Sequence, residues 1–504
     1  MNPKNLSCLL LVAMALVLSG CAAKTRATAT VPTRPIDSLD YLRPDLERIF
    51  SDPVFSNAQW GIEIISLDRG DLLFERNSAR LYMPASNNKI LTAAAAVVRL
   101  GPDFRYQTQV SAEGDVENGV LKGNLIIAGA GDPTTAARFN EDDPFRVFRG
   151  WATRLKEKGI ARIEGAIVGD GSAFPPPSIG MGWEWDDLAS GYAAPVSALQ
   201  FNENTFTVEI LPGEAEGAPA TVRCLPVPDY CPVEGMVATV APGAEARLRI
   251  EPGDRSDAFV VRGSIAMRPE PQQRTLAVPT PGLFYVAALR HALQQEGIDL
   301  AQAELRSVEE RNPGALPTAQ LLWTHSSPPL SEILKPLLKV SQNLYAETLT
   351  RTLGLVVRRE GSFNAGREVV QDILASMAVE RDGYSYADGS GLSRHNLVSA
   401  DMLIRILKYM HRHPYFAPFY DALPIAGVDG TIRSRMKGTK AENNVHAKTG
   451  TIAFVRCLSG YVRTEEGEML AFAMIANNFL ASNRAVEYVQ DSALERLANF
   501  RRRD

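Results

Sequence analysis

Three short polar motifs contain the side chains that acyl transfer to a serine needs. Residues 86–89 read Ser-Asn-Asn-Lys, residues 341–343 read Ser-Gln-Asn, and residues 448–450 read Lys-Thr-Gly. Ser86 and Lys89 are three residues apart, so on a helix their side chains share one face. A serine hydroxyl becomes a useful nucleophile only when a neighbouring base takes its proton. Ser86 is therefore the predicted nucleophile and Lys89 its predicted base.

Lys89 can accept this proton only as a neutral amine. Burial or a nearby positive charge lowers the pKa of a lysine enough for that. Residues 90–100 are apolar almost throughout and stop at Gly101, which predicts a helix buried on all sides. The helix would supply the burial, and Lys448 could supply the charge.

The third motif indicates what the substrate carries. A strand with Lys448 and Thr449 offers a cation and a hydroxyl to a carboxylate. Gly450 leaves room for close approach of the backbone. The predicted chemistry is acyl transfer from a substrate that ends in a free carboxylate.

Each motif alone is weak evidence. Ser-x-x-Lys recurs at residues 434–437, and Ser-x-Asn recurs at 362–364. We expect these extra copies to be solvated loops, because only Ser86 stands at the start of a buried helix. The ordered set of three, each in its expected setting, is far more specific.

Composition narrows the class of protein. The chain has 504 residues, of which 45% are hydrophobic, and a net charge of −5. This balance argues against a general nucleic-acid binder and against extended disorder. It fits a globular protein of two or three folding units.

The N-terminus predicts export. Residues 1–20 contain Lys4 and a short apolar run, as in a signal peptide, and Leu-Ser-Gly-Cys at 18–21 looks like a bacterial lipobox. We expect lipid on Cys21, a flexible tether over 21–37, and a periplasmic protein anchored to a bacterial membrane. In some bacteria an aspartate directly after the lipidated cysteine favours retention in the inner membrane. Position 22 is alanine here, so we expect the outer membrane rather than the inner one. A plain secretory signal is the alternative.

An exported protein can form disulfides. Cys224 and Cys231 flank a short loop with proline, and we expect them to pair, although two reduced thiols remain the alternative. Cys457 is expected to be a buried small hydrophobe. No Cys/His cluster has zinc spacing, so neither a metal nor a cofactor is predicted.

The order of elements predicts an α+β fold with an insertion. Helical and strand patterns alternate at both ends of the chain, and a β-rich stretch with many turn residues interrupts them. The expected domains are a catalytic domain of 38–101 and 283–504 and an inserted β-rich part of 102–282. The patterns predict helices over 38–50, 90–100, 282–296, 330–338, 344–353, 400–410 and 484–500, and strands over 60–75, 454–463 and 469–477.

The ordered motifs resemble those of the penicillin-recognising serine enzymes, and in particular the low-molecular-mass class C penicillin-binding proteins. These are the D-alanyl-D-alanine carboxypeptidase/endopeptidases of peptidase family S13. Longer strings extend the resemblance over the mature chain, at 129–134, 182–187, 194–199, 388–396 and 427–431. Ser341 follows Ser86 by 255 positions, a separation that matches the family's large insert. The resemblance implies a serine β-lactamase/transpeptidase-like domain, peptidoglycan stem peptides as substrates and β-lactams as inhibitors.

The resemblance also implies residue roles. Ser86 is acylated and Lys89 is its base, while Ser341 relays a proton to the leaving amine. Asn343 holds Lys89 and the substrate amide, and Lys448 and Thr449 grip the terminal carboxylate. The backbone N–H groups of Ser86 and Thr451 form the oxyanion hole.

A subsite for the side chain of the substrate's diamino acid is also implied. The family builds it from an acidic residue of the insert and an arginine after the second motif. Asp170 and Arg394 look like the matches, with a turn residue and a structural ion pair as the respective alternatives. Ala453 stands where some relatives carry a polar residue, so the side-chain preference stays open.

The sequence leaves two alternative functions open. A serine β-lactamase would need an additional base for a deacylating water, which the sequence does not place. A catalytically idle peptidoglycan-binding lipoprotein would not require Ser86, Lys89, Ser341 and Lys448 together.

Overall fold

The computed structural model describes residues 38–245, 247–253, 257–267, 270–300, 303–310 and 319–502. The expected signal peptide, Cys21 and the tether lie outside the described residues. None of the helices in the described part of the chain is both long and apolar enough to cross a membrane.

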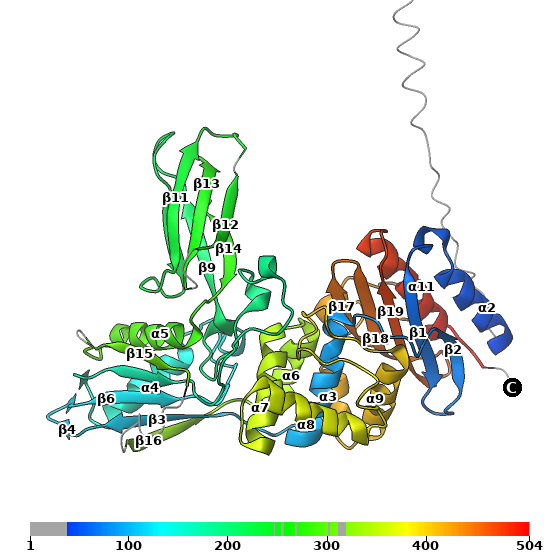
Figure 1. The fold of residues 1–504 in the computed structure, drawn as a ribbon, viewed down its shortest axis with the longest axis horizontal. Helices are drawn as coiled ribbons and strands as arrows, with labels where there is room; N and C mark the ends of the chain where they lie inside the picture. The colour runs from blue at the N-terminus through cyan, green and yellow to red at the C-terminus, as the bar shows by residue number, and fades with distance from the viewer. Residues whose placement is uncertain are drawn as a thin grey trace, which may run out of the picture. The chain divides into compact units, whose positions relative to one another are not determined.

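A five-stranded antiparallel sheet joins the two ends of the chain. Its order is β17-β18-β19-β1-β2, and β1 pairs with β19 from Gln59 opposite Asn477 to Ser66 opposite Leu470. Figure 1 shows the early strands, in blue, beside the late strands, in orange to red. The strands are β1 Gln59–Ser66, β2 Leu72–Arg76, β17 His446–Ile452, β18 Val455–Arg463 and β19 Met469–Asn477.

Helices pack on the sheet because both of its faces are apolar. Helix α2 (Leu39–Phe50) and α11 (Asn483–Ala498) share one hydrophobic cluster with it. A second cluster contains α3 (Asn88–Leu100), and every residue of α3 from Asn88 to Val97 is buried. This confirms the prediction of a helix buried on all sides. The helices in contact with α3 are α6 Leu330–Lys339, α7 Asn343–Arg358, α8 Phe363–Ser376, α9 Ala400–Arg412 and α10 Phe416–Asp421.

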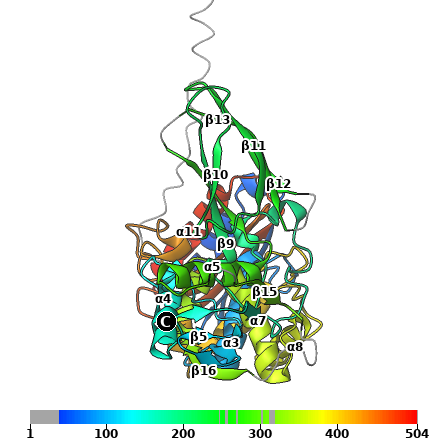
Figure 2. The ribbon, with the colours of Figure 1, turned by 90° about the vertical axis from the view of Figure 1, so that its left-hand side faces the viewer.

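The insertion is β-rich but also contains helices. One five-stranded sheet runs β15-β8-β6-β3-β16, and the chain between β8 and β15 forms two three-stranded sheets, β10-β9-β14 and β11-β13-β12 (Figure 2). A small sheet β4-β5-β7 completes it. The elements are β3 Gln107–Glu113, β4 Val116–Glu117, β5 Val120–Leu121, β6 Asn124–Ala128, α4 Arg146–Glu157, β7 Arg162–Ile163, β8 Ile167–Asp170, β9 Thr205–Leu211, β10 Thr221–Leu225, β11 Val233–Val240, β12 Leu248–Pro252, β13 Phe259–Ala266, β14 Gln272–Ala277, α5 Pro281–Gln295, β15 Leu305–Val308 and β16 Gln320–Ser326.

The expected domain boundary at residue 282 is wrong. Helix α5 packs in the same hydrophobic cluster as α4, β15 pairs with β8, and β16 pairs with β3. The insertion therefore continues to about residue 326 before the chain enters α6. Sequence reasoning placed α5 with the catalytic helices because its apolar pattern is as strong as theirs.

Two of the cysteines in the described part of the chain form a disulfide, and a third is a free thiol. Cys224 and Cys231 form a disulfide across the loop between them. Cys457 is a free and buried thiol on β18.

Candidate active site

Ser86 stands where a short 3-10 turn enters the buried helix α3. The turn, η3, spans Ala85–Asn87, and Lys89 lies one turn further along with a completely buried side chain. The Lys89 Nζ donates a hydrogen bond to the Ser86 Oγ at 2.9 Å. The expected nucleophile and base are therefore in direct contact.

Two further acceptors fix the amine of Lys89. Its Nζ donates to the Asn343 Oδ1 at 2.6 Å and to the backbone carbonyl of Ser390 at 2.7 Å. Burial lowers the pKa of Lys89 to about 7, against the opposing effect of the Asp388 and Glu347 carboxylates. A substantial fraction of Lys89 is therefore neutral near pH 7, as a general base requires.

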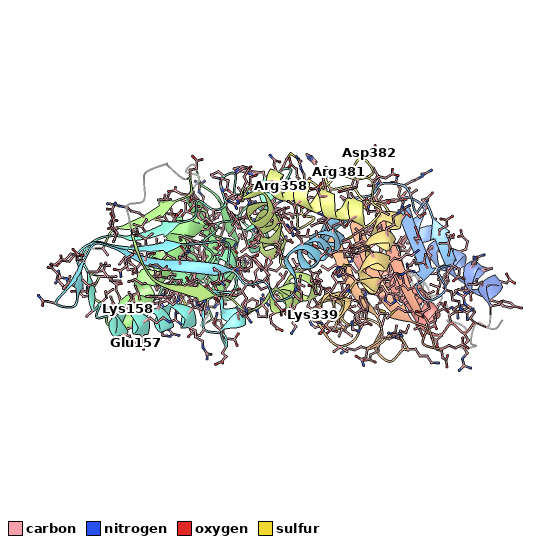
Figure 3. The ribbon with its side chains drawn as sticks, turned by 90° about the horizontal axis from the view of Figure 1, so that it is seen from below. Glu157, Lys158, Lys339, Arg358, Arg381 and Asp382 are labelled. Carbon is pink, nitrogen blue, oxygen red and sulfur yellow. A yellow bond between two sulfur atoms is a disulfide. The ribbon has the colours of Figure 1, made fainter. Side chains whose placement is uncertain are left out.

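Ser341 lies in the short turn between α6 and α7. Its φ of 64° is in the left-handed region, which non-glycine residues adopt at a cost and mostly at functional sites. The preceding helix end is held by Lys339 (Figure 3), whose Nζ donates to the Asp429 carboxylate at 2.6 Å and to the Leu423 carbonyl at 3.0 Å. The Ser341 Oγ accepts a hydrogen bond from the Lys448 Nζ at 2.8 Å.

Strand β17 brings the third motif beside Ser86. A Cβ added at Gly450 would lie 2.4 Å from the Pro84 carbonyl oxygen and 3.0 Å from the Asn87 nitrogen, so only glycine permits this approach. The Thr449 Oγ1 donates to the Thr431 Oγ1 at 2.7 Å. Thr451, the next residue, is exposed at the pocket.

Lys448 on this strand is completely buried. Burial, and then repulsion from Lys89, lower its pKa. The prediction gave Lys448 the role of lowering the pKa of Lys89 by its charge. Burial lowers the pKa of Lys89 instead, and the repulsion between the two lysines lowers the pKa of Lys448. A substrate carboxylate beside the Lys448 Nζ would favour its charged form.

Residues of the first two motifs, together with Thr451 directly after the third, line a pocket of about 450 Å³. Its volume suits a small peptide end or a drug-sized molecule. The lining residues are Ser86, Glu184, Asp186, Asp187, Tyr192, Ser341, Asn343, Gly391, Leu392, Arg394, Thr451, Ile452 and Ala453.

The predicted subsite of Asp170 and Arg394 does not form. Asp170 is buried at the end of β8, does not line the pocket, and accepts a hydrogen bond from the backbone nitrogen of Ser172. Arg394 does line the pocket, where its Nε donates to Glu184 at 2.6 Å. The carboxylates that the insertion presents to the pocket come from residues 184–187, a segment that sequence reasoning identified only as a string of resemblance.

Sequence reasoning also missed a buried carboxylate behind the site, Asp388. It accepts backbone hydrogen bonds from Gly391 and Ser393, both at 2.6 Å, and one from the Trp183 indole nitrogen at 2.8 Å. These bonds tie the loop after residue 388 to the insertion. Gly391 follows with a φ of 84°, and a Cβ there would lie 1.8 Å from the Ala85 carbonyl oxygen.

Glu347 is a second missed carboxylate, one helical turn after Asn343 on α7. It is 3% exposed and accepts hydrogen bonds from the backbone nitrogens of Ser390 at 2.7 Å and Gly389 at 3.1 Å. Burial, and then the neighbouring Asp388, raise the pKa of Glu347 to about 7. An acidic residue four positions after Asn343 shares its helix face, and this spacing could have identified it.

We expect Glu347→Gln to move the acidic limb of the pH–rate profile for acylation to lower pH. Glu347 and Asp388 both raise the pKa of Lys89, so removing one of these charges lets Lys89 lose its proton earlier. The plateau rate should fall by roughly three- to tenfold, because glutamine satisfies only one of the two backbone N–H groups. Acylation by a chromogenic cephalosporin between pH 5 and 9 measures both effects.

The matched control is Glu368→Gln, which changes an exposed glutamate on α8. It should leave the profile unchanged. If the limb of Glu347→Gln stays in place while the plateau falls, the role of Glu347 is purely structural.

In the described part of the chain, no group of three or more His, Cys, Asp and Glu side chains is arranged to hold a metal ion. The side chains bonded to one another around Ser86 and Ser341 carry hydroxyl, amine and amide groups.

A serine–lysine pair that faces a second serine and lysine, in an α+β fold with a buried central helix, defines a penicillin-recognising serine hydrolase. Residues 42–500 match the D-Ala-D-Ala carboxypeptidase 3 (S13) family, and the chain belongs to this family. This confirms the resemblance drawn from the motifs.

Individual relatives agree. The chain is 32% identical to the D-alanyl-D-alanine carboxypeptidase of Actinomadura sp. (strain R39), over 95% of this chain and 91% of that protein. It is 30% identical to the D-alanyl-D-alanine carboxypeptidase DacB of Haemophilus influenzae, over 82% and 84% of the two chains. The crystal structure of penicillin binding protein 4 (dacB) from Haemophilus influenzae superposes with a TM-score of 0.77 at 28% identity, over 89% of this chain and 97% of that one.

Proposed function

We propose that this carboxypeptidase removes the terminal D-alanine of peptidoglycan stem peptides through an acyl-Ser86 intermediate. We further propose that it cleaves D-alanyl-to-diaminopimelate cross-links at the same site. The observation that carries the proposal is the contact of the Lys89 Nζ with the Ser86 Oγ, beside a pocket lined by Ser86 and by Ser341, whose Oγ accepts a hydrogen bond from the Lys448 Nζ.

The geometry supports a sequence of proton transfers. Neutral Lys89 takes the Ser86 proton as the Oγ attacks the carbonyl carbon, and the N–H groups of Ser86 and Thr451 stabilise the oxyanion. The C–N bond then breaks, and the amine leaves with a proton delivered through the Ser341 hydroxyl. Water, deprotonated by a base in the site, attacks the Ser86 ester and restores the free serine.

The location of the enzyme is part of the proposal. A lipid on Cys21 would hold it in the periplasm at a bacterial membrane, with the outer membrane preferred. Support comes from the apolar run of residues 9–18 followed by Leu-Ser-Gly-Cys. Radiolabelled palmitate in the wild-type chain, lost in Cys21→Ser, is the expected result.

β-Lactams are proposed as acylating inhibitors. A structure of the Haemophilus influenzae protein is described as complexed with a novel β-lactam, at 27% identity and a TM-score of 0.72 to this chain. The assembled Ser86, Lys89, Ser341 and Lys448 oppose the idle-binder alternative. Family membership favours a carboxypeptidase over a β-lactamase.

Labelling with a fluorescent penicillin tests the proposal. The full-length protein should gain one stable adduct, carried by the tryptic peptide that contains Ser86, and should release D-alanine from a pentapeptide. Ser86→Ala should lose both. Ser434→Ala, the matched change in the exposed second Ser-x-x-Lys motif, should keep both. Rapid consumption of penicillin without an adduct would instead indicate a β-lactamase.

A further inference from the structure

A second, larger cavity lies away from the active-site pocket and shares none of its lining residues. Its volume is about 1020 Å³, at the upper end of what small-molecule sites span. Strands β1 and β2 form one wall, and α9 with the end of α8 forms the other. The lining residues are Glu63, Ile65, Gly70, Leu72, Glu75, Ser78, Ala79, Ser376, Met377, Ala378, Asp401, Ile404, Arg405, Lys408, Tyr409, Arg412, His413 and Pro414.

Glu63 is the unusual residue of this cavity. It lies in the middle of β1 and is only 9% exposed, yet its carboxylate has no hydrogen-bond or ion-pair partner among the described residues. Among its neighbours, Asp401 pairs with Arg405 at 2.8 Å and Glu75 accepts a hydrogen bond from the Ser78 hydroxyl at 3.1 Å, while Lys408 lies near enough to lower the pKa of Glu63 without pairing with it. The carboxylate lines the cavity and is left free to bind a group that enters it.

The surrounding charges define what that ligand carries. Burial, then Asp401 and Glu75, raise the pKa of Glu63 to about 7, while Arg405 and Lys408 act in the opposite direction. Glu75 and Asp401 therefore add two carboxylates to the cavity lining around Glu63, and Arg405 and Lys408 bring two positive charges near it. A primary ammonium group is the complement that satisfies a carboxylate in such a place.

Further along α9 from Asp401 the cavity lining is cationic. Lys408 and Arg412 follow Asp401 along the same face of α9, and neither forms an ion pair with another described residue. From Asp401 to Arg412 the helix rises about 16 Å. His413, at the same end, has its pKa lowered by burial and adds no charge near neutrality. Ile65, Leu72 and Ile404 add apolar side chains to the lining.

We propose that this cavity binds a short zwitterionic peptide, with its ammonium group on Glu63 and a carboxylate at Lys408 and Arg412. A peptidoglycan stem peptide has this chemistry, since its diamino acid and its carboxylates provide both charges. That choice of peptide rests on the proposed function. The site would hold a second strand of the same polymer while Ser86 acts on the first.

Calorimetry on penicillin-acylated protein tests the site, because acylation of Ser86 blocks the active-site pocket. The full-length protein is first acylated with benzylpenicillin and checked by mass, then titrated with L-alanyl-γ-D-glutamyl-meso-diaminopimelate. We expect one equivalent to bind, and binding to be lost when the amino groups of the peptide are acetylated. Glu63→Gln should weaken the affinity about tenfold or more, and Lys408→Ala should weaken it less.

Two controls separate folding from binding. Glu117→Gln changes an exposed glutamate of the insertion and should bind as the wild type does. Free Glu63→Gln should melt at a higher temperature than the wild type at pH 8, because a carboxyl group whose pKa is raised by folding costs stability above its unfolded pKa. If Glu63→Gln is stable and yet fails to bind the peptide, the result supports the proposed site.

The outcomes are distinct. If acylated wild-type protein does not bind the peptide, or if Glu63→Gln binds equally well, the second site is refuted. If penicillin forms no adduct, the proposed function fails at that step. The comparison of wild type with Glu63→Gln on the unacylated protein then still decides the second site.

Discussion

Lys89→Ala is expected to lower the rate of acylation by benzylpenicillin by about 10²- to 10⁴-fold, the range that a general base contributes. The Lys89 Nζ is the amine in contact with the Ser86 Oγ, at 2.9 Å, and burial keeps its pKa near 7. Without it, the described structure offers Ser86 no amine at that distance. Stopped-flow acylation, or the time course of fluorescent penicillin labelling, gives the rate.

The fold should survive the change. An ammonium group in a buried position is costly, and its removal offsets part of the cost of the cavity that alanine leaves. Lys89→Met fills the same volume without a base, so it should be as slow as Lys89→Ala while retaining the wild-type melting temperature. Rapid acylation of either variant would contradict the role of Lys89 as the base and would leave Ser341 as the next candidate for taking the Ser86 proton.

The parts of the site that follow from local sequence were predictable. A run of apolar residues after Ser86 dictates a buried helix, and the spacing of Lys89 then dictates contact with Ser86. The turn at Ser341 and the strand at Lys448 follow from the patterns on either side of them. Each of these inferences needs only a few neighbouring residues.

The parts that depend on distant contacts were not predictable in this way. Asp170 and Asp187 both belong to the insertion, and only the folded chain shows that Asp187 reaches the pocket while Asp170 is buried at the end of β8. The sequence of helix α5 likewise predicts an apolar helix but not the domain to which it belongs. That depends on the strands that α5 covers in the folded chain. The spacing of Glu347 from Asn343 places it on the same helix face, but its contact with the backbone of a loop some forty residues away is seen only in the folded chain.

Lys448→Ala is expected to remove the preference of the enzyme for substrates with a free carboxylate. Acylation by benzylpenicillin should fall about 10²-fold, as when one partner of a buried charge pair is deleted. Acylation by benzylpenicillin methyl ester, which has no carboxylate to bind, should change much less. The ratio of the two second-order rate constants, measured by labelling at several concentrations, should therefore collapse toward one.

This ratio separates recognition of the substrate from damage to the site. Lys448 also donates to the Ser341 Oγ at 2.8 Å, so its loss disturbs a group that both substrates use. A purely structural effect would slow acid and ester by the same factor and leave their ratio intact, which would refute the assignment. Lys437→Ala, at the exposed lysine of the second Ser-x-x-Lys motif, is the matched control and should change neither rate. The two buried lysines thus have separable signatures, since Lys89→Ala slows acid and ester alike while Lys448→Ala distinguishes them.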